Sequence, residues 1–129
     1  MRSYIEEITI MDAKAATGID DYIQVNAFRH VMLTLIADDS ANFTIQFQGS
    51  YSETVPDFAA AQSPTNRWDY VAVVDLESRT SIDGDTGVAI SADDVRQYEV
   101  NTNGLKWFCA RITTYGAGNA TVRVIAFSE

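Results

Sequence analysis

The sequence contains one histidine, His30, and one cysteine, Cys109. Nucleophilic hydrolysis needs a base beside the nucleophile, but His30 lies within the strand-like run 28–31, and the sequence holds no Gly-x-Ser-x-Gly nucleophile elbow. Cys109 alternates with Trp107 and Arg111 on an expected strand, with no histidine or second cysteine near it in sequence to activate the thiol. We therefore expect a structural His30, a buried and unreactive Cys109, and no catalytic residue.

Asp83 and Asp85 lie in the turn-like segment 82–87, which resembles a calcium-binding loop. An EF-hand loop that starts at Asp83 would need an oxygen ligand at its fifth position and glycine at its sixth. Those positions hold Gly87 and Val88, so the EF-hand pattern fails. A turn built from Asp and Gly is the simpler interpretation, and a looser calcium site remains an alternative.

Three acidic pairs could supply the two carboxylates that a glycosidase needs. They are Asp20-Asp21, Asp38-Asp39 and Asp93-Asp94. All three fall at expected turns, where Asp commonly bonds to nearby backbone, and sequence cannot set the distance between two carboxylates. The sequence also lacks a phosphate-binding loop and a dinucleotide fingerprint. We expect no cofactor, no metal and no enzymatic activity.

Charge and length limit the remaining classes of function. The chain has 129 residues, enough for one domain with a core, and a formal net charge of −9. This excess of acid is opposite to the basic surface that grips nucleic-acid phosphates or anionic lipid. Acidic residues near the start also argue against a secretory signal peptide. We expect no Sec-dependent secretion and no nucleic-acid or membrane partner.

Composition indicates the fold class. Val and Ile number 22 together, against 7 for Leu and Met, and Thr adds 12 more β-branched residues. Branching at Cβ restricts χ1 and suits a pleated sheet better than a helix. We predict an all-β protein, an antiparallel β-sandwich of the jelly-roll or immunoglobulin-like kind with seven to nine short strands.

The alternation of apolar and polar residues locates these strands. In residues 42–48, Phe43, Ile45 and Phe47 alternate with polar residues, which is the period of a half-buried strand. We predict one hairpin from segments 31–37 and 42–49 across the turn 38–40, and another from 105–115 and 120–127 across the turn 116–119. Further strands are expected at 22–25, 68–76 and 95–101, with a turn at 83–87.

Two segments stand outside the regular pattern. Residues 1–19 read as an N-terminal arm with one short strand, which is either the first edge strand of the domain or an extension that adds to a neighbour's sheet. The single sandwich domain then covers 20–129. Residues 50–67 hold both prolines and form a long loop, and loops of this length commonly have a function. We expect both segments to contact partners, and we expect the sandwich to fold without residues 1–11.

The second half of the sequence carries a pattern of turn and core residues. Phe47-Gln48-Gly49-Ser50 is followed by Trp68, then by Tyr98-x-Val100-x-x-x-Gly104-Leu105, then by Ala110-Arg111-Ile112-Thr113-Thr114-Tyr115 and Gly118-x-Ala120-Thr121-Val122. Over roughly residues 22–127 this resembles a group of small β-sandwich proteins from the virions of tailed phages. Such residues are specific for a fold more than for a role.

The resemblance implies a virion structural protein. Its implied role is a capsid decoration (cement) protein on the capsid surface, bound to the major capsid protein and forming a homotrimer. The alternative is a tail- or fibre-associated binding module, for which an exposed row of aromatic side chains would indicate carbohydrate binding. The expected partner contacts are Tyr4, Ile5, Ile8, Ile10, Pro56, Phe58 and Pro64. We also expect the charge of Arg111 to pair with an acid.

Overall fold

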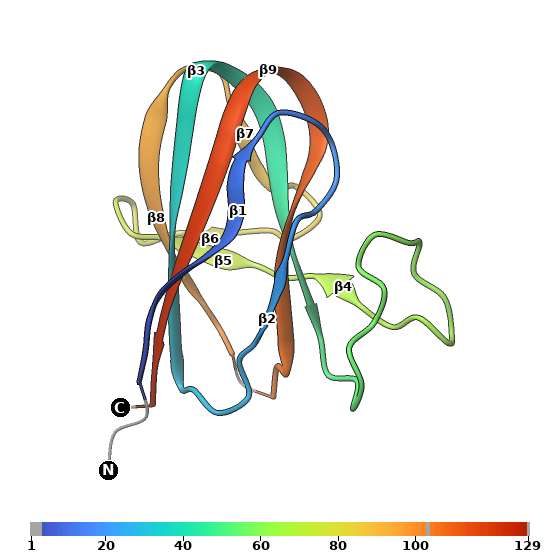
Figure 1. Cartoon of the computed structure of the whole chain (residues 1–129). Helices are drawn as coiled ribbons and strands as arrows, with labels where there is room; N and C mark the ends of the chain where they lie inside the picture. Colours follow the sequence, from blue (N-terminus) through green and yellow to red (C-terminus); the bar gives the residue numbers. More distant parts are fainter. Residues whose placement is uncertain (1–3, 103, 129) are drawn as a thin grey trace.

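The part of the chain that the structure describes folds into nine β-strands, all paired antiparallel (Figure 1). A computed structural model describes residues 4–102 and 104–128, with side chains from residue 7 onward. The strands are β1 (Tyr4–Lys14), β2 (Tyr22–Gln24), β3 (His30–Ser50), β4 (Asp69–Tyr70), β5 (Val73–Asp75), β6 (Ser81–Ile82), β7 (Val88–Ile90), β8 (Asp94–Val100) and β9 (Trp107–Phe127). The described residues include no helix long and apolar enough to cross a membrane. The predicted all-β class is confirmed.

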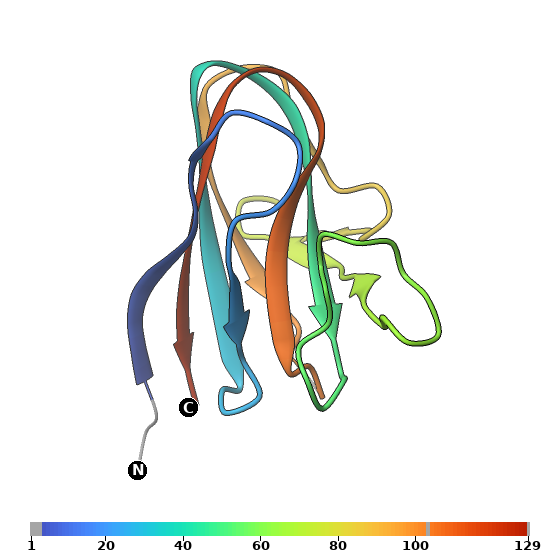
Figure 2. The same ribbon diagram turned by 45° about the vertical axis from the view of Figure 1, so that its right-hand side comes forward.

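Two long strands, β3 and β9, organise the whole molecule. Each has 21 residues and arches over one end of the domain, so that its two halves lie in different layers (Figures 1 and 2). The first layer contains β1, the second half of β9, the first half of β3, then β8, β5 and β6. The second layer contains β2, the first half of β9 and the second half of β3, which also pairs with β4 and β7. The sandwich is therefore one hydrogen-bonded sheet folded over itself.

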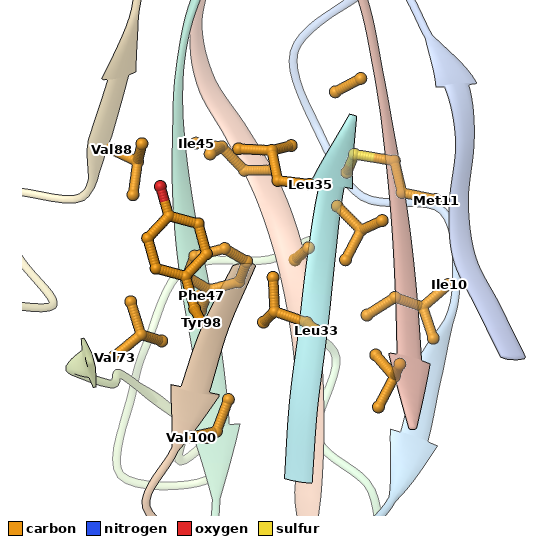
Figure 3. Packing of buried hydrophobic residues seen from close by; sticks show 14 of the residues in the cluster. Ile10, Met11, Leu33, Leu35, Ile45, Phe47, Val73, Val88, Tyr98 and Val100 are labelled. Atoms are coloured by element: carbon orange, nitrogen blue, oxygen red, sulfur yellow. The ribbon is translucent and has the colours of Figure 1, made fainter. Parts of the chain in front are cut away.

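The main core fills the space between the two layers (Figure 3). Leu33 and Leu35 enter it from the first half of β3, and Ile45 and Phe47 enter it from the second half. The ring of Phe47 packs against that of Tyr98 from β8, with 6.1 Å between ring centroids. On each half of β3, every second side chain points into the core, because successive side chains of a strand point to opposite faces. The inward side chains of the two halves therefore pack against each other between the layers.

The two predicted hairpins are wrong, because each is a single bent strand. Segment 31–37 does not pair with 42–49. Instead, both pair with β9, for example through Leu35 with Val122 and Ile45 with Ile112. Asp39 and Ser40 do have the positive φ angles of a turn, 63° and 59°. They form a bulge on the outside of the bend, where residues 39–41 of β3 lie opposite residue 118 of β9.

Shorter elements match the predictions in part. The expected strand at 68–76 is interrupted and gives β4 and β5 instead of one strand. The turn at 83–87 is confirmed, because the backbone N–H groups of Thr86 and Gly87 both donate to the carbonyl oxygen of Asp83. The Asp83 carboxylate accepts a further bond from the backbone of Asp85. Asp83 thus bonds to its own turn, as Asp commonly does.

The N-terminal segment contributes the edge strand β1, in agreement with the first of its two interpretations. β1 pairs with β9 from Tyr4 to Lys14, with three register shifts on the way. Ile10 and Met11 are 2% and 0% exposed and belong to the main core. Deleting residues 1–11 would remove both side chains from the core, so the burial of β1 argues against the expectation that the sandwich folds without them.

Candidate functional site

The residues with catalytic or metal-binding chemistry are dispersed over the fold. The His30 ring stacks on Phe127 with 5.0 Å between centroids. Cys109 is buried as predicted, and burial raises the pKa of its thiol to about 12. That thiol stays protonated at neutral pH, which makes it a poor nucleophile. Among the described residues, no three His, Cys, Asp or Glu side chains gather where they could hold a metal ion.

The acidic pairs bond to backbone and to a lysine, and only some of these contacts are local in sequence. The Asp93 carboxylate accepts a hydrogen bond from the backbone N–H of Ala41 at 2.9 Å and so fixes the bend of β3. The Asp20 carboxylate forms an ion pair with Lys14 at 3.0 Å. Asp38 accepts a bond from the backbone N–H of Asp39. These carboxylates stabilise turns and the β1 edge.

The seven expected contact residues divide into exposed and buried ones. Ile8 on β1 is 46% exposed, Pro64 is exposed and Pro56 is half-buried. Ile10 and Phe58 are corrections, because both lie in the interior, with 2% and 1% of their surface exposed. Tyr4 and Ile5 belong to β1, but their side chains lie outside the described part of the chain.

One half of β1 presents an open backbone edge. β1 is the first strand of its layer, so only one of its edges pairs with β9. On the other edge, the carbonyl oxygen of Ile10 accepts a bond from the backbone N–H of Asp21, and the N–H of Asp12 donates to the Asp20 carboxylate. Within the described chain no strand pairs with residues 4–9 on that side. We call this segment the free edge.

The loop between β3 and β4 covers the outer face of the second layer. We call residues 51–68 the capping loop. Its side chains Phe58 and Trp68 pack on Cys109 and form a second, smaller core outside the sandwich. The amide of Gln48 donates to the carbonyl oxygen of Phe58 at 2.9 Å, and Ser50 donates to that of Arg67 at 2.6 Å. The outward-facing side of β3 is therefore buried here instead of open to water.

The capping loop is held by bonds within itself. The side chain of Asn66 accepts a bond from the backbone N–H of Asp57 and donates to the carbonyl oxygens of Asp57 and Ala61. The indole N–H of Trp68 donates to the carbonyl oxygen of Ala60 at 3.1 Å. A loop with this many internal bonds keeps one shape and can present a fixed surface.

Arg111 connects the sheet to the capping loop, and among the described residues no acid forms the ion pair that was predicted for it. Its guanidinium donates to the carbonyl oxygen of Phe58 at 3.3 Å and lies over the Trp68 ring, 6.0 Å from the ring centroid. A guanidinium over an indole face is attracted by the negative charge of the ring face. The charge of Arg111 therefore holds the loop to the sheet.

A surface groove lies between the start of the capping loop and β4. Its volume is about 610 Å³. We call it the Tyr51 groove, after the side chain that is 76% exposed beside it. Its lining consists of Gly49, Ser50, Tyr51, Ser52, Glu53, Arg67, Trp68, Asp69, Tyr70, Val71 and Leu105. Sequence reasoning selected the 50–67 loop as a contact surface, but within it named Pro56, Phe58 and Pro64 and did not single out Tyr51. The feature of the sequence that could have indicated the groove is an aromatic residue, Tyr51, directly after the end of a strand.

Comparison with known proteins shows a fold and no family. No family model matches the sequence, and no curated protein matches it. Among solved structures, the chain is similar to the crystal structure of the SPBc2 prophage-derived protein YomS, with a TM-score of 0.69 and 12% sequence identity. The match covers 99% of this chain and 96% of that one. At this identity the likeness establishes a shared fold.

Proposed function

We propose that the chain is a structural protein of a tailed-phage virion, and that it decorates the head shell by binding the major capsid protein. The observation that carries this proposal is the fold match with a prophage-derived protein over nearly the full length of both chains. Because the match covers nearly all of both chains, the two proteins share the whole domain. A chance similarity between parts of two β-sandwiches would cover only a part of each chain.

The free edge supplies the means of attachment. Residues 4–9 carry backbone donors and acceptors that no strand of the described chain pairs on the outer side. A partner segment in extended conformation can add to such an edge through main-chain bonds. Ile8, which is 46% exposed there, gives that partner an apolar contact. We propose that a segment of the shell adds to β1 in this way.

The charge and the residue types fit the proposed role. A decoration protein needs a rigid scaffold and an exposed contact surface, and it needs no catalytic centre. A net charge of −9 keeps the free protein soluble before assembly. We propose synthesis in the bacterial cytoplasm, followed by attachment to the capsid surface. A homotrimer is proposed from the resemblance to virion proteins, and light scattering would then give a mass near three times 14.2 kDa.

The proposal is tested by binding to purified head shells of the phage that encodes the chain. The intact protein is sedimented with shells and compared with Ile8→Lys, which places a charge at the free edge. The matched control is Leu76→Lys, since Leu76 is 51% exposed and follows β5 near the other margin of the same layer. We expect Ile8→Lys to reduce binding at least tenfold and Leu76→Lys to bind normally. Equal binding of all three proteins would overturn attachment through β1.

A tail- or fibre-associated binding module is the second candidate function. The observation that favours it is the Tyr51 groove, which an attachment protein without a ligand would not need. The row of exposed aromatic side chains that would indicate carbohydrate binding is only partly present, because Trp68 is 7% exposed. Binding of the protein to tails and not to heads in the same sedimentation assay would favour this candidate.

A further inference from the structure

We propose that the Tyr51 groove binds a neutral saccharide, which stacks on the Tyr51 ring and accepts and donates hydrogen bonds at the rim of the groove. Its volume of about 610 Å³ lies in the range of ordinary small-molecule sites. The inference concerns the groove alone and holds whether the protein lies on the head or on the tail.

The Tyr51 ring offers a stacking surface. At 76% it is the most exposed large apolar side chain of the described residues. One side of the ring lies near Gly104, where an added Cβ atom would be 3.5 Å from Cε1 and 3.8 Å from Cδ1 of the ring. The ring thus lies close to the backbone on that side and leaves its other surface to the solvent. The C–H face of a sugar ring can cover that surface and bury apolar area.

Three charged side chains supply the polar contacts. Glu53, Arg67 and Asp69 all line the groove. One oxygen of Asp69 accepts bonds from the backbone N–H of Tyr70 at 2.8 Å and from the amide of Gln62 at 3.3 Å, which fixes the carboxylate in place. Carboxylates accept bonds and a guanidinium donates them in a planar fork, so together they can satisfy neighbouring hydroxyl groups.

The balance of these charges favours a neutral ligand. Two acidic residues, Glu53 and Asp69, and one arginine line the groove, and the ammonium of Lys106 bonds to the backbone carbonyl oxygen of Glu53 at 2.7 Å. The four charges cancel, so the groove offers no excess of positive charge to attract an anion such as a phosphate or a sialylated sugar. An apolar peptide would make no hydrogen bond to the three charged residues, which are exposed beside the groove. A neutral polyhydroxyl compound can stack on the Tyr51 ring and can also form hydrogen bonds with the charged groups beside the groove.

The walls of the groove are fixed before any ligand binds. Ser50 and Ser52 both donate to the carbonyl oxygen of Arg67, at 2.6 and 3.3 Å, and join the two walls. Trp68 is 7% exposed, and its indole N–H bonds to Ala60. Such preorganisation lowers the entropic cost of binding. The capping loop and β4, whose residues line the groove, lie on the other side of the sandwich from β1 (Figure 2), so a ligand and a partner at the free edge do not compete for space.

The test uses the full chain against an immobilised panel of neutral oligosaccharides that end in glucose, galactose, mannose or N-acetylglucosamine, with sialylated versions as anionic probes. Any neutral sugar that binds is then titrated in solution by calorimetry. Tyr51→Ala and Asp69→Asn are compared with Tyr22→Ala, a control at a tyrosine that is 47% exposed on β2. Thermal unfolding confirms that each variant is folded.

We expect at least one neutral sugar to bind, and we expect both Tyr51→Ala and Asp69→Asn to weaken its binding tenfold or more. Tyr22→Ala should leave the affinity within twofold. The proposal is overturned by binding of sialylated sugars alone, by the absence of any binding at millimolar sugar, or by equal loss in Tyr51→Ala and Tyr22→Ala. None of these results bears on attachment to head shells, because Ile8→Lys tests that separately.

Discussion

The carbonyl oxygen of Asp38 lies 2.5 Å from the position that a Cβ atom would occupy at Gly118. The two residues face each other where β3 and β9 bend from one layer into the other, next to the pair Asp38–Asn119. Gly118 also has a φ angle of +79°, which disfavours other residues. The bend that forms the sandwich therefore requires glycine at position 118, because a residue with a side chain would clash with the backbone there.

Replacing that glycine should destabilise the protein strongly. We expect Gly118→Ala to lower the free energy of unfolding by about 2–4 kcal/mol, because the added methyl group clashes with backbone and the φ angle is strained. Gly104→Ala is the matched control: its φ is +81°, but its nearest neighbour is the flexible ring of Tyr51 at 3.5 Å. It should cost only about 1 kcal/mol. Urea unfolding measures both, and equal effects would show that the approach of Asp38 is unimportant.

Arg111 should stabilise the capping loop through its contacts with Phe58 and Trp68. We expect Arg111→Ala to lower the free energy of unfolding by about 1–2 kcal/mol, with little change between low and high salt, because neither contact is an exposed ion pair. Arg123→Ala is the control, since its pairing with Glu7 at 3.7 Å is about half exposed. It should change stability by about 0.5 kcal/mol or less. A strong salt dependence for Arg111→Ala would contradict this account.

The stability of the fold should depend on pH through Asp75. Burial raises the pKa of its carboxyl, but hydrogen bonds from the backbone N–H of Glu77 at 2.9 Å and from Arg96 at 2.6 Å outweigh that effect and hold the pKa below its usual value. A carboxyl with a lowered pKa stabilises the fold above its unfolded pKa of about 4, and this contribution is lost as the pH falls through the folded-state pKa.

We therefore expect Asp75→Asn to cost about 1–2 kcal/mol at pH 7 and much less at pH 2–3. Urea unfolding of both proteins at the two pH values gives the comparison. If the two proteins differ in free energy of unfolding by the same amount at both pH values, the interaction between Asp75 and Arg96 makes no contribution to stability that depends on ionisation.

Cys109 should resist thiol reagents while the protein is folded. Burial raises the pKa of its thiol to about 12 and also blocks access, since the side chain is 0% exposed. We expect a disulfide reagent at pH 8 to modify the native protein at least a hundredfold more slowly than the protein in denaturant. Rapid modification of the native form would mean that β2 and the capping loop open often enough to expose the thiol.

The sequence predicted what short-range patterns can predict. Alternation around Phe43, Ile45 and Phe47 identified a half-buried strand and its inward face, and Asp83 was correctly placed in a turn. It did not predict the pairing of β3 with β9. Residues with positive φ, such as Asp39 and Gly118, look the same in a hairpin and in a bent strand. Only the distant partner strand distinguishes the two.

Exposure was predicted poorly where a segment has no regular period. Ile10 and Phe58 were assigned to a surface, yet one completes the main core and the other the core beneath the capping loop. Tyr51 escaped notice for the opposite reason, since nothing in its neighbours distinguishes an exposed ring from a buried one. In all three cases burial is decided by contacts between segments far apart in the chain.

The most direct test of the central claim is the protein composition of purified particles of the phage or prophage that encodes this chain. Quantitative mass spectrometry of separated heads and tails gives the copy number of each protein. The account predicts that the chain is present on heads in many copies, in a fixed ratio to the major capsid protein. Its absence from purified particles would contradict a virion role, and its presence in tails alone would contradict capsid decoration.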